Sequence, residues 1–509
     1  MKVLFSNQFP KFRNFYLDNN MIAKRIGIVG GGIAGLASAI RFAVAGNTVE
    51  VFEQGDVVGG KLNQLLGSGY RFDTGPSLFT LPNLVDELFE LAGKRREDYF
   101  NYHQLDLVTR YFYPDGLVLN AYSSAKKFAK ECSDKVGEPS ENIINYLESC
   151  RDLYESTANL FLFSPFPSKE AFKRPEAKQL AAHPGKLRAF TTMHRVNRKS
   201  FSDKRLVQLF DRYATYNGSN PYRAPGTLTM IPHLEHNIGA YFPAGGMRQI
   251  SDALERLALD LGVTFHFCTP VEKILVGRSG AYGLVAGGKE VRFDVVVNDT
   301  DIFYAYPKLL PNITLPWIYK RQQPSTSAMI FYWGVKGVHP ELDLHNILFA
   351  ENYRKEFGEM ERGRISCDPT VYIFISSRMV NSDAPDGCEN WFTMINVPPD
   401  TGQSWPHLVE ESRVNIQAKI KTMLGIDLTG KIEFERVVDP PTIARNTSSF
   451  GGALYGISSN GMMAAFSRHP NHRKSIPGLY FVGGSVHPGG GIPLCLASAK
   501  IVDKIVASE

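Results

Sequence analysis

The chain has few cysteines and no strong excess of charge of either sign. Its 509 residues contain six cysteines, none in a C-x-x-C pair and none with the spacing of metal ligands. This indicates scattered reduced thiols and gives no reason to expect a disulfide framework or a metal site. A net charge of +5 is small for this length, so composition does not suggest a nucleic-acid partner.

Long apolar runs are absent as well. No 18 uninterrupted apolar residues occur, and the nearest candidate, residues 26–46, contains Arg41. We therefore expect no membrane-spanning helix. Residues 1–20 lack the apolar stretch of a signal peptide, and Met21, just before the first expected strand, is a candidate for the natural start.

What the chain does contain is typical of a globular enzyme of more than one domain. Apolar residues make up 43% and charged residues 21%. A chain of 509 residues is longer than one hydrophobic core usually supports. We therefore expect two domains, which can be interleaved in sequence.

The first distinctive segment is KRIGIVGGGIAGLASAIRFAVAGNTVEVFEQG. Its pattern predicts a strand over residues 25–29, a glycine turn, a helix over about 33–45 and a second strand over 48–52. This β–α–β order is that of a dinucleotide-binding unit, which makes the glycine motif more specific than it would be alone.

The turn carries Gly30-x-Gly32-x-x-Gly35. The first glycine permits the tight turn, the second lets the backbone approach a pyrophosphate, and the third lets helix and strand pack closely. The N-terminus of the helix offers N–H groups to the phosphates. Glu53, at the end of the second strand, is placed to accept a hydrogen bond from a ribose hydroxyl.

Two further turns favour FAD over NAD. QGDVVGGKL adds backbone N–H groups at Gly59 and Gly60 and a cation at Lys61. RFDTGPSLFTLP adds another turn at Gly75 and Pro76. A plain NAD enzyme does not need these extensions, so FAD is the expected cofactor.

A second glycine hinge lies near the C-terminus, in YFVGGSVHPGGGIPLCLASAKI. We expect a strand over 479–482 that returns beside the first unit, followed by turns through Gly484, Gly490 and Gly491. The helix that starts near Ile492 would point its N-terminus at the flavin, where it would favour negative charge on the reduced ring. The two glycine motifs would then bind two ends of one cofactor.

With both motifs in view, the sequence resembles the bacterial-type carotenoid (phytoene) desaturases. The resemblance runs from about residue 24 to the end and is also carried by YFPAGGMRQI and VRFDVVVNDTD. It implies an α/β fold: a Rossmann-type FAD-binding domain of discontinuous segments with an inserted α+β substrate domain. It also implies cofactor contacts at Val271 and at Asn298, although Asp299 stands where the family usually has alanine.

The same resemblance implies the domain boundaries. We assign 21–100, 245–315 and 470–509 to the FAD-binding domain, and 101–244 and 316–469 to the substrate domain.

One central segment narrows the expected substrate. FDRYATYNGSNPYRAPGTLTMIPHLEHNIGAYFPAGG (210–246) is similar to the hydroxycarotenoid 3,4-desaturases. The expected activity is therefore introduction of a C-3,4 double bond into a 1'-hydroxylated carotenoid by hydride transfer to flavin. A phytoene or diapophytoene desaturase of the same family stays an alternative, as do an amine or porphyrinogen oxidase and a non-catalytic prenyl-lipid-binding protein.

Carotenoid desaturation removes a hydride from one carbon and a proton from its neighbour. The cation left behind is delocalised over the polyene, so a weak base suffices, and positioning is the main demand. One or more polar residues of the central segment are candidates for binding the hydroxyl or for acid–base work: Asp211, Arg212, Tyr213, His233, Glu235 and His236.

Residues 159–201 combine a Phe-rich run with many basic residues, Lys169 and Lys173 among them. Such a segment can lie on an anionic membrane surface, although a solvated basic helix pair has the same pattern. We expect a protein of the cytoplasm that attaches peripherally to the inner face of the cell membrane. The electron acceptor, oxygen or a membrane quinone, is left open.

Overall fold

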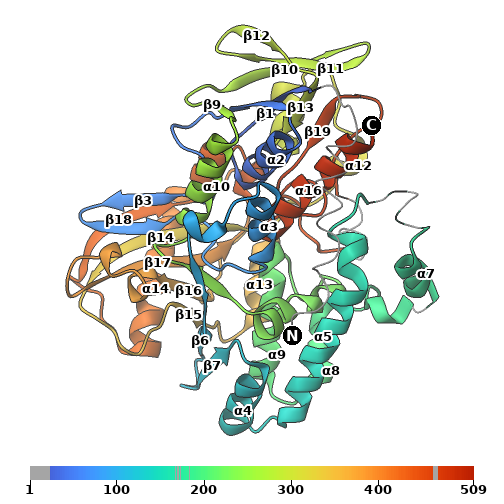
Figure 1. Ribbon diagram of the computed structural model, residues 1–509. Coiled ribbons are helices and arrows are strands. Elements are labelled where there is room, and N and C mark those ends of the chain that lie inside the picture. The colour runs from blue at the N-terminus through green and yellow to red at the C-terminus, as the bar shows by residue number, and fades with distance from the viewer. Residues whose placement is uncertain (1–22, 167, 169–170, 172, 183, 462–467) are drawn as a thin grey trace.

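The computed structural model describes residues 23–166, 168, 171, 173–182, 184–461 and 468–509 (Figure 1). Two residues named above, Met21 and Lys169, lie outside these ranges. No helix within the described ranges is long and apolar enough to cross a membrane.

The predicted β–α–β unit is confirmed. It consists of β1 (Arg25–Val29), α2 (Ile33–Val44) and β2 (Thr48–Phe52). β1 and β2 are parallel neighbours, and four of the five β1 residues are buried. This is the pattern of an inner strand of a parallel sheet covered on both faces.

β1 is the central strand of a five-stranded parallel sheet with the order β19–β13–β1–β2–β9. The other strands are β9 (Thr264–His266), β13 (Val295–Asn298) and β19 (Leu479–Phe481). The C-terminal strand thus returns to the sheet of β1, but β13 lies between them and the strand ends at Phe481.

Three helices pack together beside this sheet. α2 contacts both α10 (Arg248–Asp260) and α16 (Ile492–Ser508), as Figure 1 shows. α16 begins at the predicted Ile492, directly after Gly491. Segments from both ends of the chain and from its middle therefore build one layer, as expected for a discontinuous Rossmann-type domain.

A mixed seven-stranded sheet forms the second large unit. In its order β18–β14–β17–β16–β15–β6–β7 only β15 and β6 are parallel neighbours. The strands are β6 (Leu107–Phe112), β7 (Val118–Tyr122), β14 (Ser327–Lys336), β15 (His345–Leu348), β16 (Val371–Ile375), β17 (Cys388–Val397) and β18 (Ile432–Val438).

The two faces of this sheet have different roles. On one face Trp333 and Trp391, paired across β14 and β17, form a buried cluster with Ile416 of α14 (Trp405–Leu424). On the other face Tyr332 and Phe392 line a cavity. This alternation follows from side chains pointing to opposite faces along a strand.

The remaining α-helices and strands lie outside these two sheets. They are α3 (Asn83–Leu91), α4 (Ala125–Val136), α5 (Ser140–Phe161), α7 (Pro175–Ala182), α8 (Met193–Ser200), α9 (Lys204–Asp211), α11 (Ile302–Tyr304), α12 (Trp317–Lys320), α13 (Tyr353–Glu361), α15 (Pro440–Thr447), β3 (Gln64–Gly67), β4 (Tyr70–Asp73), β5 (Tyr102–Gln104), β8 (Tyr241–Pro243), β10 (Val271–Gly277), β11 (Gly280–Ala286) and β12 (Lys289–Arg292). Of these, β10, β11 and β12 form a small sheet of their own.

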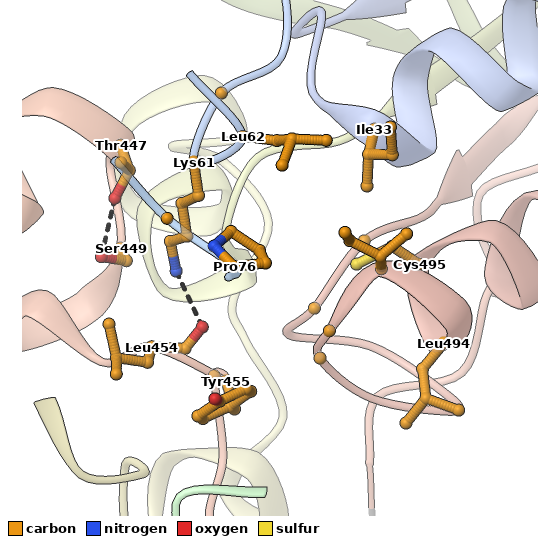
Figure 2. Close-up of a pocket in the computed structure, with 18 of the residues that line it drawn as sticks. Ile33, Lys61, Leu62, Pro76, Thr447, Ser449, Leu454, Tyr455, Leu494 and Cys495 are labelled. Atoms are coloured by element: carbon orange, nitrogen blue, oxygen red, sulfur yellow. Dashed lines mark hydrogen bonds between the residues drawn. The ribbon is translucent and has the colours of Figure 1, made fainter. Parts of the chain in front are cut away.

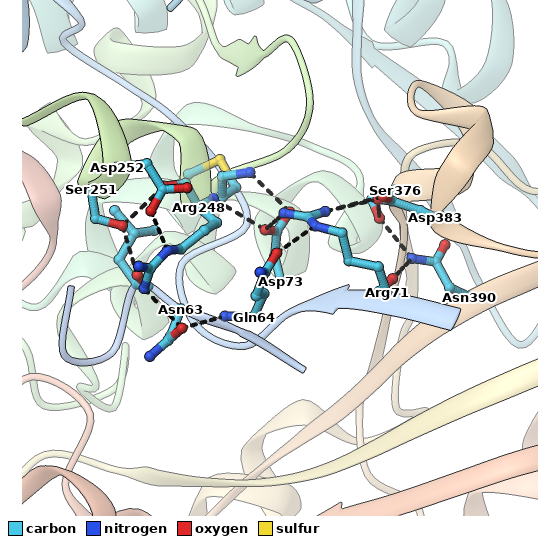
Figure 3. A network of polar contacts seen from close by, with 12 residues as sticks. Asn63, Gln64, Arg71, Asp73, Arg248, Ser251, Asp252, Ser376, Asp383 and Asn390 are labelled. Carbon is cyan, nitrogen blue, oxygen red and sulfur yellow. Dashed lines mark hydrogen bonds and ion pairs between the residues drawn. The ribbon is translucent and has the colours of Figure 1, made fainter. Parts of the chain in front are cut away.

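A buried polar network joins the two units (Figure 3). Asp73, at the end of β4, accepts hydrogen bonds from the backbone nitrogens of Met247 (2.9 Å) and Arg248 (3.2 Å) at the start of α10. Arg71 pairs with Asp73 (2.7 Å) and with Asp383 (3.0 Å), which follows β16 of the seven-stranded sheet. The segment RFDTGPSLFTLP, which begins at Arg71, is thus in direct contact with the YFPAGGMRQI segment.

Candidate functional site

A cavity of about 890 Å³ connects the two sheets. Its lining includes the glycine turns of the five-stranded sheet and the inner face of the seven-stranded sheet. All the predicted cofactor residues line this cavity except Gly35 and Asn298. Motifs hundreds of residues apart in sequence therefore meet at one site.

The first glycine turn has the expected geometry. Gly30 has φ 94°, which a residue with a side chain rarely adopts. A Cβ on Gly35 would lie 2.2 Å from the carbonyl oxygen of Gly30, so the third glycine allows the helix to pack on the turn. Glu53 accepts hydrogen bonds from the backbone nitrogens of Gly31 (2.7 Å) and Gly55 (2.8 Å). Its role toward a ribose stays a prediction.

Asp299 lies directly under this turn. Its Oδ2 accepts a hydrogen bond from the backbone nitrogen of Gly35, 2.9 Å away. Burial and the nearby Glu53 raise the pKa of Asp299 to about 7, against hydrogen bonds from Gly35 and Gly32 and the charge of Lys61, which lower it. The carboxyl therefore titrates in the physiological range.

Lys61, which follows Gly59 and Gly60, forms hydrogen bonds to a loop far away in sequence. Its Nζ donates to the carbonyl oxygens of Ala453 (3.1 Å) and Leu454 (3.0 Å), and Figure 2 shows it beside Pro76. A Cβ on Gly75 would lie 1.9 Å from the carbonyl oxygen of Lys61. The two turns that favoured FAD in the sequence therefore pack on each other.

The C-terminal turn closes the opposite wall. A Cβ on Gly490 would lie 2.8 Å from the Cα atom of Tyr455, so this glycine packs directly on that backbone. Gly491 has φ 98° and precedes Ile492, the first residue of α16. Figure 2 places Leu494 and Cys495 of this helix across the cavity from Lys61.

Two predicted cofactor residues differ in their positions. Val271, at the start of β10, lines the cavity. Asn298 is fully buried at the end of β13, where its side chain exchanges hydrogen bonds with Thr300 (2.8 and 3.0 Å). Asn298 therefore shapes the turn that follows β13, and Asp299 and Thr300 line the cavity in its place.

These residues fit FAD. Glycine backbones from three segments, a helix N-terminus, a carboxylate at the end of β2 and a lysine form the wall of one cavity. With the carboxylate being that of the partly buried Glu53, this is the donor and acceptor set that a dinucleotide with a pyrophosphate needs.

Of the predicted acid–base candidates, only Arg212 lines the cavity. Asp211 points elsewhere and binds His194 (2.7 Å) and Asn197 (2.8 Å), both on α8. His233 pairs with Asn237 (2.9 Å). These two residues serve packing in the helical part, and burial lowers the pKa of His233 to about 4.

Tyr213, Glu235 and His236 lie behind Arg212 and are fully buried. The Tyr213 hydroxyl donates to Glu235 (2.7 Å) and lies 2.9 Å from Nε2 of His236. Glu235 Oε2 is 3.8 Å from Nη2 of Arg212. Glu235, held by Tyr213, therefore balances the positive charge of Arg212.

The sequence did not single out Ser77, His345 and Tyr372, which also line the cavity. The Tyr372 hydroxyl lies 2.6 Å from Ser77 Oγ and 2.8 Å from His345 Nδ1. Each residue stands alone in a loop or an apolar strand, and a lone histidine in a strand is typical of a core position. The pairing of β15 with β16 brings His345 and Tyr372 together, and Ser77 reaches them from the loop after Pro76.

The Phe-rich basic segment borders the same cavity. Phe161, Leu162 and Phe166 line it, and Leu160, Phe166 and Leu180 form a small buried cluster. Phe190 is 77% exposed, four residues after the exposed Lys186. Part of the segment is therefore cavity wall and part is surface.

Comparison with known proteins agrees with this geometry. Residues 33–301 match the family described as flavin containing amine oxidoreductase. The chain is 46% identical over 485 residues to 1-hydroxycarotenoid 3,4-desaturase from Flavobacterium sp. (strain P99-3), covering 95% of this chain and 99% of that protein. It is 32% identical over 500 residues to 4,4'-diapolycopene oxygenase from Methylomonas sp, covering 95% and 98%.

Solved structures show the same fold at low identity. A putrescine oxidase variant aligns with a TM-score of 0.61 and 15% identity over 96% of this chain and 99% of its own. An oxidoreductase from Methanosarcina mazei aligns equally well, over 94% and 100%. The predicted fold class, the FAD cofactor and the oxidoreductase class are confirmed. The chain belongs to the flavin-containing amine oxidoreductase family and, within it, to the group that contains the carotenoid desaturases.

Proposed function

We propose that this protein introduces a C-3,4 double bond into a hydroxylated carotenoid. The observation that carries the proposal is that one cavity is lined by the dinucleotide turns, by many apolar side chains and by Arg212. The 46% identity to a protein named 1-hydroxycarotenoid 3,4-desaturase supports this substrate over phytoene.

The wall suits a polyene. Ile330, Tyr332, Phe392 and Met394 from β14 and β17 line the cavity side by side. Such a surface positions an apolar chain and excludes water, which is the main demand of the reaction. When bound, FAD supplies a two-electron acceptor for the hydride.

The proton does not require a strong base. Arg212 is a donor only and does not take it up. Asp211 and Glu235 carry carboxylates, but both are held by partners away from the wall. Because charge is delocalised over the polyene, water or a backbone carbonyl is base enough. We therefore assign Arg212 to substrate binding.

We also propose peripheral contact with the inner face of the cell membrane through residues 159–201. Carotenoids dissolve in lipid, and this segment combines cavity-lining Phe161 and Phe166 with exposed Phe190 and Lys186. An apolar side chain beside a cation suits an anionic lipid surface. Oxygen or a membrane quinone would then reoxidise the flavin.

Product analysis tests the proposed reaction. The purified FAD-loaded protein receives phytoene or a 1-hydroxylated carotenoid in liposomes, and absorbance-monitored chromatography follows the products. We expect conversion of the hydroxylated compound to a red-shifted product. Conversion of phytoene alone would support the alternative desaturase, and binding of both compounds without conversion of either would support a lipid-binding role.

A further inference from the structure

A polar cluster interrupts the apolar wall of the cavity. It consists of Ser77, Arg212, His345 and Tyr372, all of which line the cavity. His345 on β15 lies beside β16, which carries Tyr372, and Tyr372 bridges to Ser77 just after the Gly75–Pro76 turn. The hydrogen-bond chain therefore links the imidazole to the loop that follows the Gly75–Pro76 turn.

His345 presents one free nitrogen. Its side chain is almost fully buried, and its ring stacks on Phe374 with centroids 5.1 Å apart. Nδ1 is bonded to Tyr372, whereas Nε2 has no hydrogen-bond partner in the part of the chain that the structure describes. Burial and the charge of Arg212 lower the pKa of His345 to about 3, so the ring is neutral and Nε2 forms one hydrogen bond.

Arg212, another residue of the cavity lining, has buried donors without a hydrogen-bond partner among the residues that the structure describes. Its guanidinium packs over the rings of Tyr111, Tyr213 and Tyr216, 4.6–5.3 Å from their centroids. Nε and Nη2 are buried and make no hydrogen bond within the described residues, although Glu235 balances the charge at 3.8 Å. Unsatisfied buried donors are costly, so a ligand that accepts hydrogen bonds from them gains affinity.

We propose that Arg212 and His345 together bind the hydroxyl group of the substrate. A hydroxyl can accept two hydrogen bonds and donate one. Its oxygen therefore accepts a hydrogen bond from the guanidinium while its O–H donates one to Nε2 of His345. In the other tautomer of His345, with the ring hydrogen on Nε2, the hydroxyl oxygen accepts hydrogen bonds from both Nε2 and the guanidinium. An unsubstituted end leaves both groups unpaired, which is how a site rejects an analogue that lacks a hydroxyl.

This inference rests on the proposed function and makes its specificity explicit. The relative is named for a 1-hydroxycarotenoid, not a 1'-hydroxylated one, so here the hydroxyl is taken to lie at the same end as the C-3,4 bond, with its carbon two bonds from C-3. Holding that hydroxyl therefore also fixes the reacting carbon along the cavity.

The test compares binding and turnover of a 1-hydroxylated carotenoid and its deoxy counterpart in mixed micelles. The variants are His345→Phe, which keeps the stacked ring, and Arg212→Lys, which keeps the charge. His345→Gln is a polar replacement in case the Phe variant does not fold. His339→Gln is the matched control, because His339 is buried and bonded to Glu389 (2.8 Å) but does not line the cavity.

We expect the wild-type protein and His339→Gln to prefer the hydroxylated compound in Kd and in kcat/KM. The preference should fall about 2- to 10-fold in His345→Phe and about 10- to 100-fold in Arg212→Lys, with little change for the deoxy compound. An unchanged preference in both variants, or none in the wild type, would overturn the inference. If the proposed reaction is wrong but the hydroxyl site is right, the protein will bind the hydroxylated compound selectively and form no product.

Discussion

The carboxylate of Asp299 accepts a 2.9 Å hydrogen bond from the backbone N–H of Gly35, in the first turn of α2. Asp299 directly follows β13, the strand next to β1. Gly35 is the third glycine of the dinucleotide motif, and the carboxylate lies where a negative charge is favoured by the helix. A pyrophosphate bound where the glycine motif predicts it would bring negative charge to the same turn. Asp299 and FAD therefore interact through their charges.

FAD affinity should depend on pH through Asp299. Its pKa is raised to about 7, chiefly by burial and by Glu53, with Lys61 acting in the opposite direction. A bound dianion raises this pKa further, so FAD binding takes up a proton and the Kd should rise by up to about tenfold per pH unit above pH 7. Flavin fluorescence titrations from pH 6 to 9 measure this.

Asp299→Asn is the matched variant, because its amide oxygen can still accept from Gly35. We expect it to bind FAD more tightly than the wild type at pH 8.5, with a nearly flat pH dependence. Parallel pH profiles of the two proteins would contradict the role of Asp299.

Lys61→Met should weaken FAD binding by about tenfold or more, since it removes a cation and two hydrogen bonds. The lost bonds are those to Ala453 and Leu454, which join two walls of the cofactor cavity. Lys61→Arg, which keeps the charge, should lose less. Equilibrium dialysis against FAD compares the three proteins, and equal retention would show that the lysine does not serve the cofactor site.

Asp73→Ala should lower the free energy of unfolding by about 3 kcal/mol or more. It removes the acceptor for two backbone nitrogens of α10 and one partner of Arg71 (Figure 3). Asp73→Asn keeps an acceptor and should cost less. Urea unfolding followed by circular dichroism measures both variants. A loss below about 1 kcal/mol for the Ala variant would show that the network contributes little to stability.

The double variant Lys186→Glu, Phe190→Ser should bind anionic liposomes about tenfold or more weakly than the wild type. It reverses one exposed charge and removes a 77% exposed aromatic side chain. Val414→Ser on α14 is the control, because Val414 is 65% exposed but lies outside the segment. Equal flotation of all three proteins with the liposomes would exclude this segment as the membrane contact.

The glycine motifs could be predicted from the sequence because their chemistry is local. Gly30, Gly32 and Gly35 define a turn between one strand and one helix, so their spacing alone places them. The same holds for Gly491 and the start of α16 at Ile492. Even the return of the C-terminal strand could be expected, although not that β13 would lie between it and β1.

The substrate side could not be predicted in the same way. Asp211 and Arg212 are adjacent in sequence, yet only Arg212 lines the cavity, because the chain turns from α9 into the short helix Arg212–Asn217. His345 and Tyr372 meet through the pairing of β15 with β16. Strand order is a long-range property, so no local pattern indicates it.

The most direct test of the proposed reaction is one anaerobic turnover followed by mass spectrometry. One equivalent of a 1-hydroxylated carotenoid is mixed with FAD-loaded protein in the absence of any other electron acceptor. We expect a product that has lost two hydrogens at C-3 and C-4, in an amount equal to the bound FAD. Unchanged hydroxylated carotenoid, with loss of hydrogens from phytoene under the same conditions, would contradict the proposed function.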